Sequence, residues 1–216
     1  MMKGLKSVVW KLLNILGIGG AVNLHLQSGL KEDGWFLSFR KQQSIDKDSL
    51  PIPWLTYPFI KFLEPRLSSQ MSLYEFGCGN STLWYSARVR EVKAVEHDKK
   101  WHQTISQSLP DNASVALKKL EDGNAYEASI ITQEQAFDVI IIDGKKRNEC
   151  VEFAFQALHP HGVIILDNSE RNEYQPAKEM LEAKGFKRLD FFGPTPIVAI
   201  TSCTSVFYRT NNCFNI

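Results

Sequence analysis

From residue 72 onward, short apolar segments with strand character alternate with segments that have helical spacing. The clearest strand is Phe137 to Ile142, which is almost wholly apolar, as expected of a parallel strand covered on both faces. Such alternation is typical of a parallel sheet wound with helices on both sides. The expected strands are 73–76, 92–96, 114–117, 137–142, 162–166, 187–192 and 205–208, and the expected helices are 81–87, 101–109, 150–158 and 177–184.

The last two expected strands are joined by a stretch rich in proline and threonine, which favours an antiparallel pair. Dinucleotide-binding folds usually end with parallel strands instead. We therefore predict an α/β, Rossmann-like, doubly wound and mostly parallel seven-stranded sheet, with an antiparallel C-terminal strand pair and a helical N-terminal extension. We expect two parts: an extension over residues 1–70 that could act as a lid, and the main domain over 71–216.

Composition excludes several classes of protein. The chain has 216 residues, 44% of them hydrophobic, which suits one domain with a full core and a short extension. The net charge is only +1 and no basic stripe is present, so no nucleic-acid partner is expected. None of the four cysteines forms a C-x-x-C pair, which disfavours a zinc or redox motif and makes the reducing cytoplasm the expected location.

Residues 1–22 are basic and apolar, but Lys11 and Asn14 interrupt the apolar run and three glycines weaken it as a helix. The run is too short and broken for a transmembrane span. Three interpretations stay open: a helix packed on the domain, a contact between copies in a homo-oligomer, and a helix lying in a membrane surface. In the last case the protein would be peripheral to a membrane.

A glycine-rich loop, Glu75 to Thr82, follows an expected strand and opens an expected helix. Glycines let the backbone turn sharply and approach a ligand, and the helix N-terminus adds free N–H groups. Glu96 ends the next strand, where a carboxylate can accept the hydroxyl protons of a ribose. These features together predict a nucleotide-type cofactor.

Two residues of this loop distinguish between cofactors. Thr82 stands where dinucleotide-binding loops carry a third glycine. Glu75 stands just before the first glycine, where its carboxylate would repel a pyrophosphate but favour the cationic amino-acid end of S-adenosylmethionine. The loop therefore favours S-adenosylmethionine over NAD.

An acid, one residue and then G-x-G resembles the first motif of the class I methyltransferases, and the resemblance covers roughly residues 70–210, including the final antiparallel pair. It implies that Glu75 and the loop backbone hold the methionine part of the cofactor, that Glu96 holds the ribose, and that residues near Glu121 and Asp122 approach the adenine. The expected cofactor-binding residues are Glu75, Gly77, Cys78, Gly79, Asn80, Ser81, Thr82, Glu96, His97 and Asp143.

A second polar group follows the fourth and fifth expected strands: Asp143, then Asp167 and Asn168. Carboxyl ends of neighbouring parallel strands meet at one crevice, and these oxygen donors suit a hard cation such as Mg²⁺. The pattern resembles the cation-dependent O-methyltransferases, which implies a metal held by these three residues and Lys146 as a base. Gly144 and Arg147 depart from that family's loop.

Alternatives to the metal site remain open. Asp143 could order a substrate loop and Asp167 could cap a turn, without metal. Arg147 could grip an anionic acceptor or lie at the surface. Upstream, Trp54 and Tyr57 could wall the pocket as a lid, or could simply pack in the core as aromatic residues do.

We expect an enzyme that transfers a methyl group from S-adenosylmethionine to a small molecule or glycan, at an oxygen, with Asp143 and Lys146 as the catalytic residues and a divalent cation as an open question. The rivals are an NAD-linked oxidoreductase, an aminopropyltransferase and a non-catalytic nucleotide-binding protein. The acceptor itself is not encoded in any motif, since acceptor pockets come from variable loops.

Overall fold

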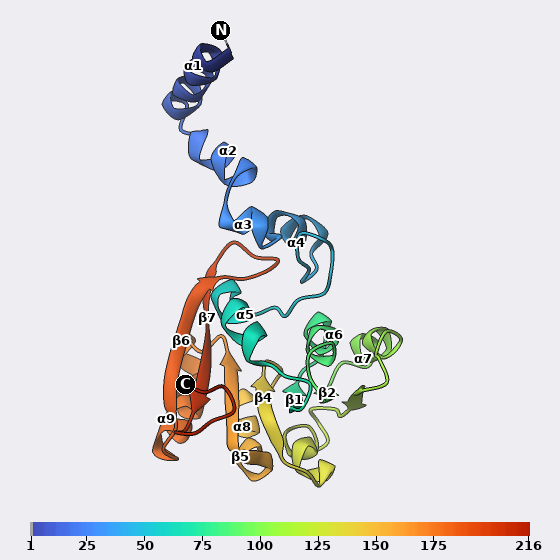
Figure 1. Ribbon diagram of the computed structural model, residues 1–216. Coiled ribbons are helices and arrows are strands. Elements are labelled where there is room, and N and C mark those ends of the chain that lie inside the picture. Colours follow the sequence, from blue (N-terminus) through green and yellow to red (C-terminus); the bar gives the residue numbers. More distant parts are fainter. Residues whose placement is uncertain (1) are drawn as a thin grey trace.

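The structure, a computed structural model, describes residues 2–216 and contains a seven-stranded sheet in the order β3-β2-β1-β4-β5-β7-β6 (Figure 1). Every pairing from β3 to β5 is parallel, whereas β7 runs antiparallel to both of its neighbours. The predicted fold class is therefore confirmed. The strands are β1 (Ser72–Phe76), β2 (Glu91–Glu96), β3 (Ala113–Leu117), β4 (Phe137–Ile142), β5 (Leu158–Asp167), β6 (Lys187–Pro194) and β7 (Thr201–Tyr208).

Strand β5 is longer than the sequence predicts. The segment His159–Gly162 was expected to separate helix from strand, but β5 already begins at Leu158, which pairs with Phe137 of β4. The register between β4 and β5 shifts between Phe137 and Val139, so the irregular segment is absorbed within the pairing instead of ending it.

Helices cover both faces of the sheet. One face packs against α8, α9 and η2, and the other against α5 and α6. Strand alternation divides the apolar residues between these layers: Ile140 and Ile142 face the first, whereas Val139 and Ile141 face the second. The helices are α1 (Met2–Ile15), α2 (Gly19–Leu26), α3 (Gly29–Glu32), α4 (Trp35–Lys41), α5 (Tyr57–Leu63), η1 (Glu64–Arg66), α6 (Asn80–Ser86), α7 (Lys99–Ser106), η2 (Glu127–Gln133), α8 (Arg147–Ala157), η3 (Asn172–Tyr174) and α9 (Gln175–Ala183).

The N-terminal extension is helical, as predicted, but it does not pack as one layer on the domain. Helices α1 and α2 project away from the sheet, and Gly17, with a φ of +72°, marks the break between them (Figure 1). The interpretation of α1 as a helix packed on the domain is therefore wrong. Helices α3 and α4 connect this projecting part to the domain, where the side chain of Trp35 donates to the carbonyl of Val198 at 2.8 Å.

Among residues 2–216, no helix combines the length and the apolar character that a membrane crossing would require.

The layered core makes a simple stability prediction. Ile141 is fully buried in β4, so Ile141→Ala should lower the free energy of unfolding by about 2–5 kcal/mol through lost burial and a residual cavity. Ile131→Ala, at an exposed isoleucine in η2, should stay within about 0.5 kcal/mol of the parent protein. Urea denaturation of both variants checks this, and equal losses would contradict the assignment of the core.

Candidate active site

Three acids lie at the carboxyl edge of the central strands, on the face covered by α5 and α6. Glu75 pairs in register with Ile141, which belongs to that face, and Asp143 follows Ile141 by two residues. Asp167 likewise follows Ile165, which belongs to the same face. Since side chains two residues apart share a face, the strand pattern that buries the isoleucines also directs these carboxyl groups to one layer.

Glu75 is almost fully buried and is held by two hydroxyls of the following helix. Ser81 donates to Oε1, and Thr82 donates to Oε2 at 2.6 Å. The Thr82 hydroxyl also accepts from the backbone N–H of Gly79 at 3.0 Å, so it joins the acid to the glycine loop. This explains why threonine, and not a third glycine, occupies the position.

Glu96 uses its two carboxylate oxygens differently. Oε1 accepts from the backbone N–H groups of His97 and Asp98, both at 2.7 Å, and lies 2.7 Å from Nδ1 of His97. Oε2 has only the thiol of Cys78, at 3.7 Å, as a partner within residues 2–216. One oxygen therefore fixes the turn after β2, and the other remains able to accept from a ligand.

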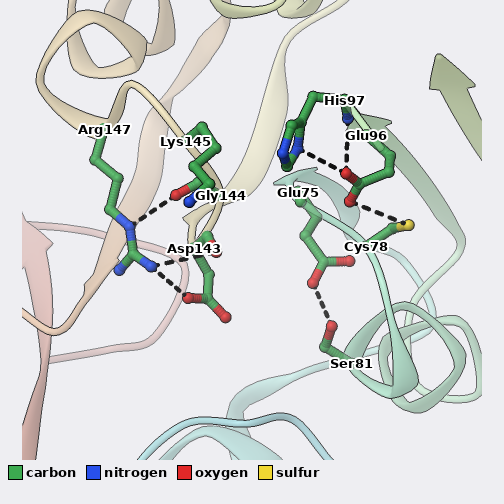
Figure 2. A pocket seen from close by; sticks show the side chains of 10 residues that line it. Glu75, Cys78, Ser81, Glu96, His97, Asp143, Gly144, Lys145 and Arg147 are labelled. Carbon is green, nitrogen blue, oxygen red and sulfur yellow. Dashed lines mark hydrogen bonds and ion pairs between the residues drawn. The ribbon is translucent and has the colours of Figure 1, made fainter. Parts of the chain in front are cut away.

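These acids border a cavity of about 230 Å³ (Figure 2). Figure 2 shows Asp143 and Arg147 on one side of it, facing Glu75 and Glu96 on the other. The lining residues are Glu75, Gly77, Cys78, Ser81, Glu96, His97, Asp143, Gly144, Lys145 and Arg147. Because three of these are acids and Arg147 is the only buried cation among them, the cavity favours a positively charged ligand and disfavours a pyrophosphate.

Two glycines bring the loops around the cavity close together. Gly77 has a φ of +101°, a conformation that favours glycine. A Cβ on Gly144 would lie 2.0 Å from the hydroxyl of Tyr126 and 3.0 Å from the backbone nitrogen of Gly77. The loop after β4 thus requires glycine at 144, a role that the sequence analysis missed although a glycine directly after a strand-ending acid hints at it.

The guanidinium of Arg147 lies where the sequence analysis expected a metal ion. Its Nη2 contacts Oδ1 of Asp143 at 2.9 Å, and its Nη1 donates to the carbonyl of Asp167 at 2.5 Å and lies 4.0 Å from Oδ2 of that residue. Nε donates to the carbonyl of Gly144 at 3.0 Å. The side chain is 8% exposed, and each of its nitrogens already has a partner. Arg147 is therefore not a surface residue, and it is not free to bind an anionic acceptor, which were the two alternatives that the sequence left open.

The expected metal ligands do not converge. Asp167 is occupied by the Thr204 hydroxyl at 2.6 Å, and Asn168 turns its amide to the hydroxyl of Ser202 at 2.9 Å. Across the described part of the chain, no group of three His, Cys, Asp or Glu side chains is placed to hold a metal. The donor set therefore does not fit a divalent cation, because Arg147 already supplies the positive charge.

Lys146 does not reach the cavity, contrary to the prediction that it is a base. It caps α8 with a φ of +50°, which turns its side chain toward η2. There Nζ contacts both carboxylate oxygens of Glu127 at 3.2 Å and the carbonyl of Gly123 at 2.9 Å. The neighbouring Lys145 lines the cavity instead.

The remaining expected residues lie around the cavity and not in it. Asn80 donates to the carbonyl of Ser44 at 2.7 Å, which ties the glycine loop to the N-terminal extension. Glu121 and Asp122 are exposed and do not line the cavity. Tyr57 packs in the core beside α6, and Trp54 is exposed, so neither walls this cavity.

Burial raises the pKa of all three strand-end acids. The pKa of Glu75 rises to about 7, against the opposing effect of its two hydroxyl donors. The pKa of Asp143 also rises, because burial outweighs the pairing with Arg147. Burial and then the charge of Asp143 raise the pKa of Asp167 as well. Tyr85, whose buried hydroxyl has no hydrogen-bond partner within residues 2–216, also has a pKa raised by burial and then by these acids.

Comparison with known proteins agrees with this geometry. Residues 74–169 match a family model described as a methyltransferase domain. No curated protein matches the chain significantly. With the sheet order and the acidic cavity, this match supports the class I, S-adenosylmethionine-dependent methyltransferase superfamily for residues 74–169.

Solved structures support the same fold. The precorrin 8W decarboxylase of Methanobacterium thermoautotrophicum is 17% identical, with a TM-score of 0.55 over 78% of this chain and 96% of that one. The precorrin-6y C5,15-methyltransferase of Geobacter metallireducens is 14% identical, with a TM-score of 0.54 over 70% and 88%. A candidate methyltransferase of Streptococcus mutans in complex with SAH is 12% identical, with a TM-score of 0.50 over 69% and 94%. At these identities the likeness concerns the fold.

The raised pKa of Glu75 predicts how stability depends on pH. Folding raises this pKa from 4.5 to about 7, so the stabilisation from protonated Glu75 is full below about pH 4.5 and is lost as pH rises through about 7. Relative to Glu75→Gln, which does not titrate, the parent protein should lose on the order of 3 kcal/mol of unfolding free energy between about pH 5 and pH 8. Urea denaturation at several pH values measures this difference. Parallel pH profiles would show that Glu75 ionises normally.

Proposed function

We propose that the protein methylates an oxygen of a small molecule or glycan, using S-adenosylmethionine, without a divalent cation. The observation that carries the proposal is the position of the Asp143 carboxyl group, which has one oxygen bound and, among the described residues, the other free. Its Oδ1 is held by Arg147, whereas Oδ2 has no hydrogen-bond partner within residues 2–216, and the residue lines the acidic cavity. Asp143 is therefore positioned, and its raised pKa makes it a stronger base than an ordinary aspartate.

The cavity suits the cofactor at both of its polar ends. The carboxylate of Glu75 would attract the ammonium group, and Oε2 of Glu96 would accept from a ribose hydroxyl. The glycine loop from Gly77 to Gly79 would let the cofactor approach the backbone closely. Bound there, the cofactor supplies a methyl group made electrophilic by its positively charged sulfur.

Asp143 would act on the acceptor. When the acceptor oxygen takes the methyl group and the carbon–sulfur bond breaks, Oδ2 of Asp143 would take up the hydroxyl proton. Arg147 fixes the carboxylate through Oδ1 and so limits the orientations that it can adopt. The protein would contribute mainly by aligning the two reactants and placing the base.

The same charge pattern disfavours the rival cofactor. A dinucleotide would place its anionic pyrophosphate beside Glu75 and Asp143, where Arg147 is the only buried cation among the lining residues that could offset the repulsion and Lys145 is exposed to solvent. Arg147 is already committed to both aspartates and to the carbonyl of Gly144. This argument supports S-adenosylmethionine over NAD.

Glu96 offers a test of the cofactor pose. Glu96→Gln keeps an acceptor for the N–H groups of His97 and Asp98 but replaces the free oxygen by an amide. Calorimetric titration should show S-adenosylhomocysteine bound about 10- to 100-fold more weakly, because a charge-assisted hydrogen bond is lost. Glu91→Gln, at the opposite end of β2, is the matched control and should bind normally. Equal affinity in the two variants, or preferential binding of NAD by the parent protein, would refute the pose.

Asp143 offers a test of the chemistry. Asp143→Asn keeps an oxygen for Arg147 and removes the base, so turnover should fall by about 100-fold or more while S-adenosylhomocysteine affinity stays within about threefold. Turnover is measured as S-adenosylhomocysteine release with an acceptor found by screening hydroxylated compounds. Asp111→Asn, at an exposed turn residue, is the control and should retain full turnover.

Removal of metal ions by a chelator distinguishes catalysis by Asp143 as a base from catalysis that needs a bound metal ion. Turnover of the parent protein should be unchanged by EDTA, because Arg147 occupies the position between the aspartates. Loss of turnover with EDTA and its recovery with Mg²⁺ would overturn the metal-free proposal.

A further inference from the structure

The projecting N-terminal part has an unusual surface. Residues 6–26, which include most of α1 and all of α2, form an arm. Eight large apolar side chains of the arm are 47–81% exposed to solvent: Val8, Val9, Leu12, Ile15, Leu16, Ile18, Leu24 and Leu26. Single exposed apolar residues are ordinary, but eight along one projecting segment mark an interaction surface.

The charges of the chain are also unevenly distributed between the N-terminal part and the rest. Residues 1–31 contain four lysines and no aspartate or glutamate, whereas the chain as a whole has 25 basic and 24 acidic residues. The remainder of the chain therefore carries a net negative charge. A partner of the arm must accept both apolar side chains and positive charge.

The spacing within α1 places these two properties on separate sides of the helix. At helical spacing, the exposed apolar residues of α1 share a side and Lys6 and Lys11 flank its two edges; these apolar residues are Val8, Val9, Leu12 and Ile15. Both lysines are exposed. An apolar side bordered by lysines suits the boundary between the acyl chains and headgroups of a bilayer, because lysine stems can lie along apolar material while their ammonium groups reach phosphate.

A basic cavity lies where the arm meets α3 and α4. It has a volume of about 610 Å³, and its lining includes His25, Lys31, Arg40 and Lys47, with Glu32 as its acid. Arg40 makes no ion pair or side-chain hydrogen bond within the described residues, while Lys31 donates to the carbonyl of Leu26 and Lys47 pairs with Asp48. Positive charge therefore continues from α1 to the base of the arm.

We propose that the arm docks the protein onto an anionic lipid surface. Helix α1 lies along the surface with its apolar side inserted, its lysines contact lipid phosphates, and the basic cavity at α3 and α4 faces the headgroups. An apolar protein groove would bury the exposed residues equally well, but it would gain nothing from an acid-free segment. Charge complementarity therefore favours the anionic surface over a second copy of the chain, whose remaining surface is only mildly negative.

Sedimentation with lipid vesicles tests the proposal on the full chain. We expect the parent protein to sediment with vesicles of phosphatidylglycerol and phosphatidylcholine, and to bind pure phosphatidylcholine vesicles at least about tenfold more weakly. Raising the salt concentration should weaken binding to the anionic vesicles, because the lysine contribution is screened. Lys6→Glu with Lys11→Glu should weaken it by about tenfold or more.

The apolar contribution has a matched control. Leu12→Glu with Ile15→Glu should abolish sedimentation, whereas Ile131→Glu, at an exposed apolar residue of η2 in the domain, should leave it unchanged. All variants should bind S-adenosylhomocysteine as the parent does, which shows that the domain is folded and separates this proposal from the proposed function. No sedimentation of the parent with either vesicle, equal binding to both, or arm variants that change only the oligomeric state in light scattering would overturn it.

Discussion

The active-site architecture depends on one buried cation. The parallel strands β1, β4 and β5 bring Glu75, Asp143 and Asp167 to one edge of the sheet, and these carboxyl groups would repel one another in a medium of low dielectric. Arg147 offsets this by pairing with both aspartates while it hydrogen-bonds the carbonyls of Gly144 and Asp167. It thereby joins the ends of β4 and β5 and sets the direction in which Asp143 faces the cavity. One guanidinium cannot compensate three carboxylates, so the raised pKa values are the expected consequence.

This charge balance connects the fold to its chemistry. A cavity with surplus negative charge is a poor place for a pyrophosphate and a suitable one for a cationic cofactor. The match of residues 74–169 to a methyltransferase domain is consistent with that preference. The same guanidinium removes the reason to expect a divalent cation between the aspartates. A metal ion could supply positive charge to such a group of oxygen donors. Here Arg147, the first residue of α8, supplies it instead.

The molecule also divides its charges and its apolar surface between two parts. The acids that matter for the cavity lie in the domain, at the carboxyl edge of the sheet, whereas the segment before residue 32 has four lysines, no acid and many exposed apolar residues. Such a division lets one part be adapted to a reaction and the other to a location. The stretch that joins the two parts is tied to the domain: Trp35 donates to the carbonyl of Val198, and the carbonyl of Ser44 accepts from Asn80 of the glycine loop.

Local patterns in the sequence determined much of this protein. Apolar strands fix the sheet because burial on two faces needs continuous apolar runs, and the Glu75–Thr82 loop with Glu96 could be recognised since each lies directly beside a strand end. The positions at strand ends also placed Asp143, Asp167 and Asn168 at one crevice. Only the tertiary structure decided which positively charged side chain pairs with these acids. Lys146 stands at the expected spacing, but its positive φ and the distant Glu127 turn it away, while Arg147 fills the space between two strands. A side chain's direction depends on partners far away in the chain, and such partners leave no trace in local spacing.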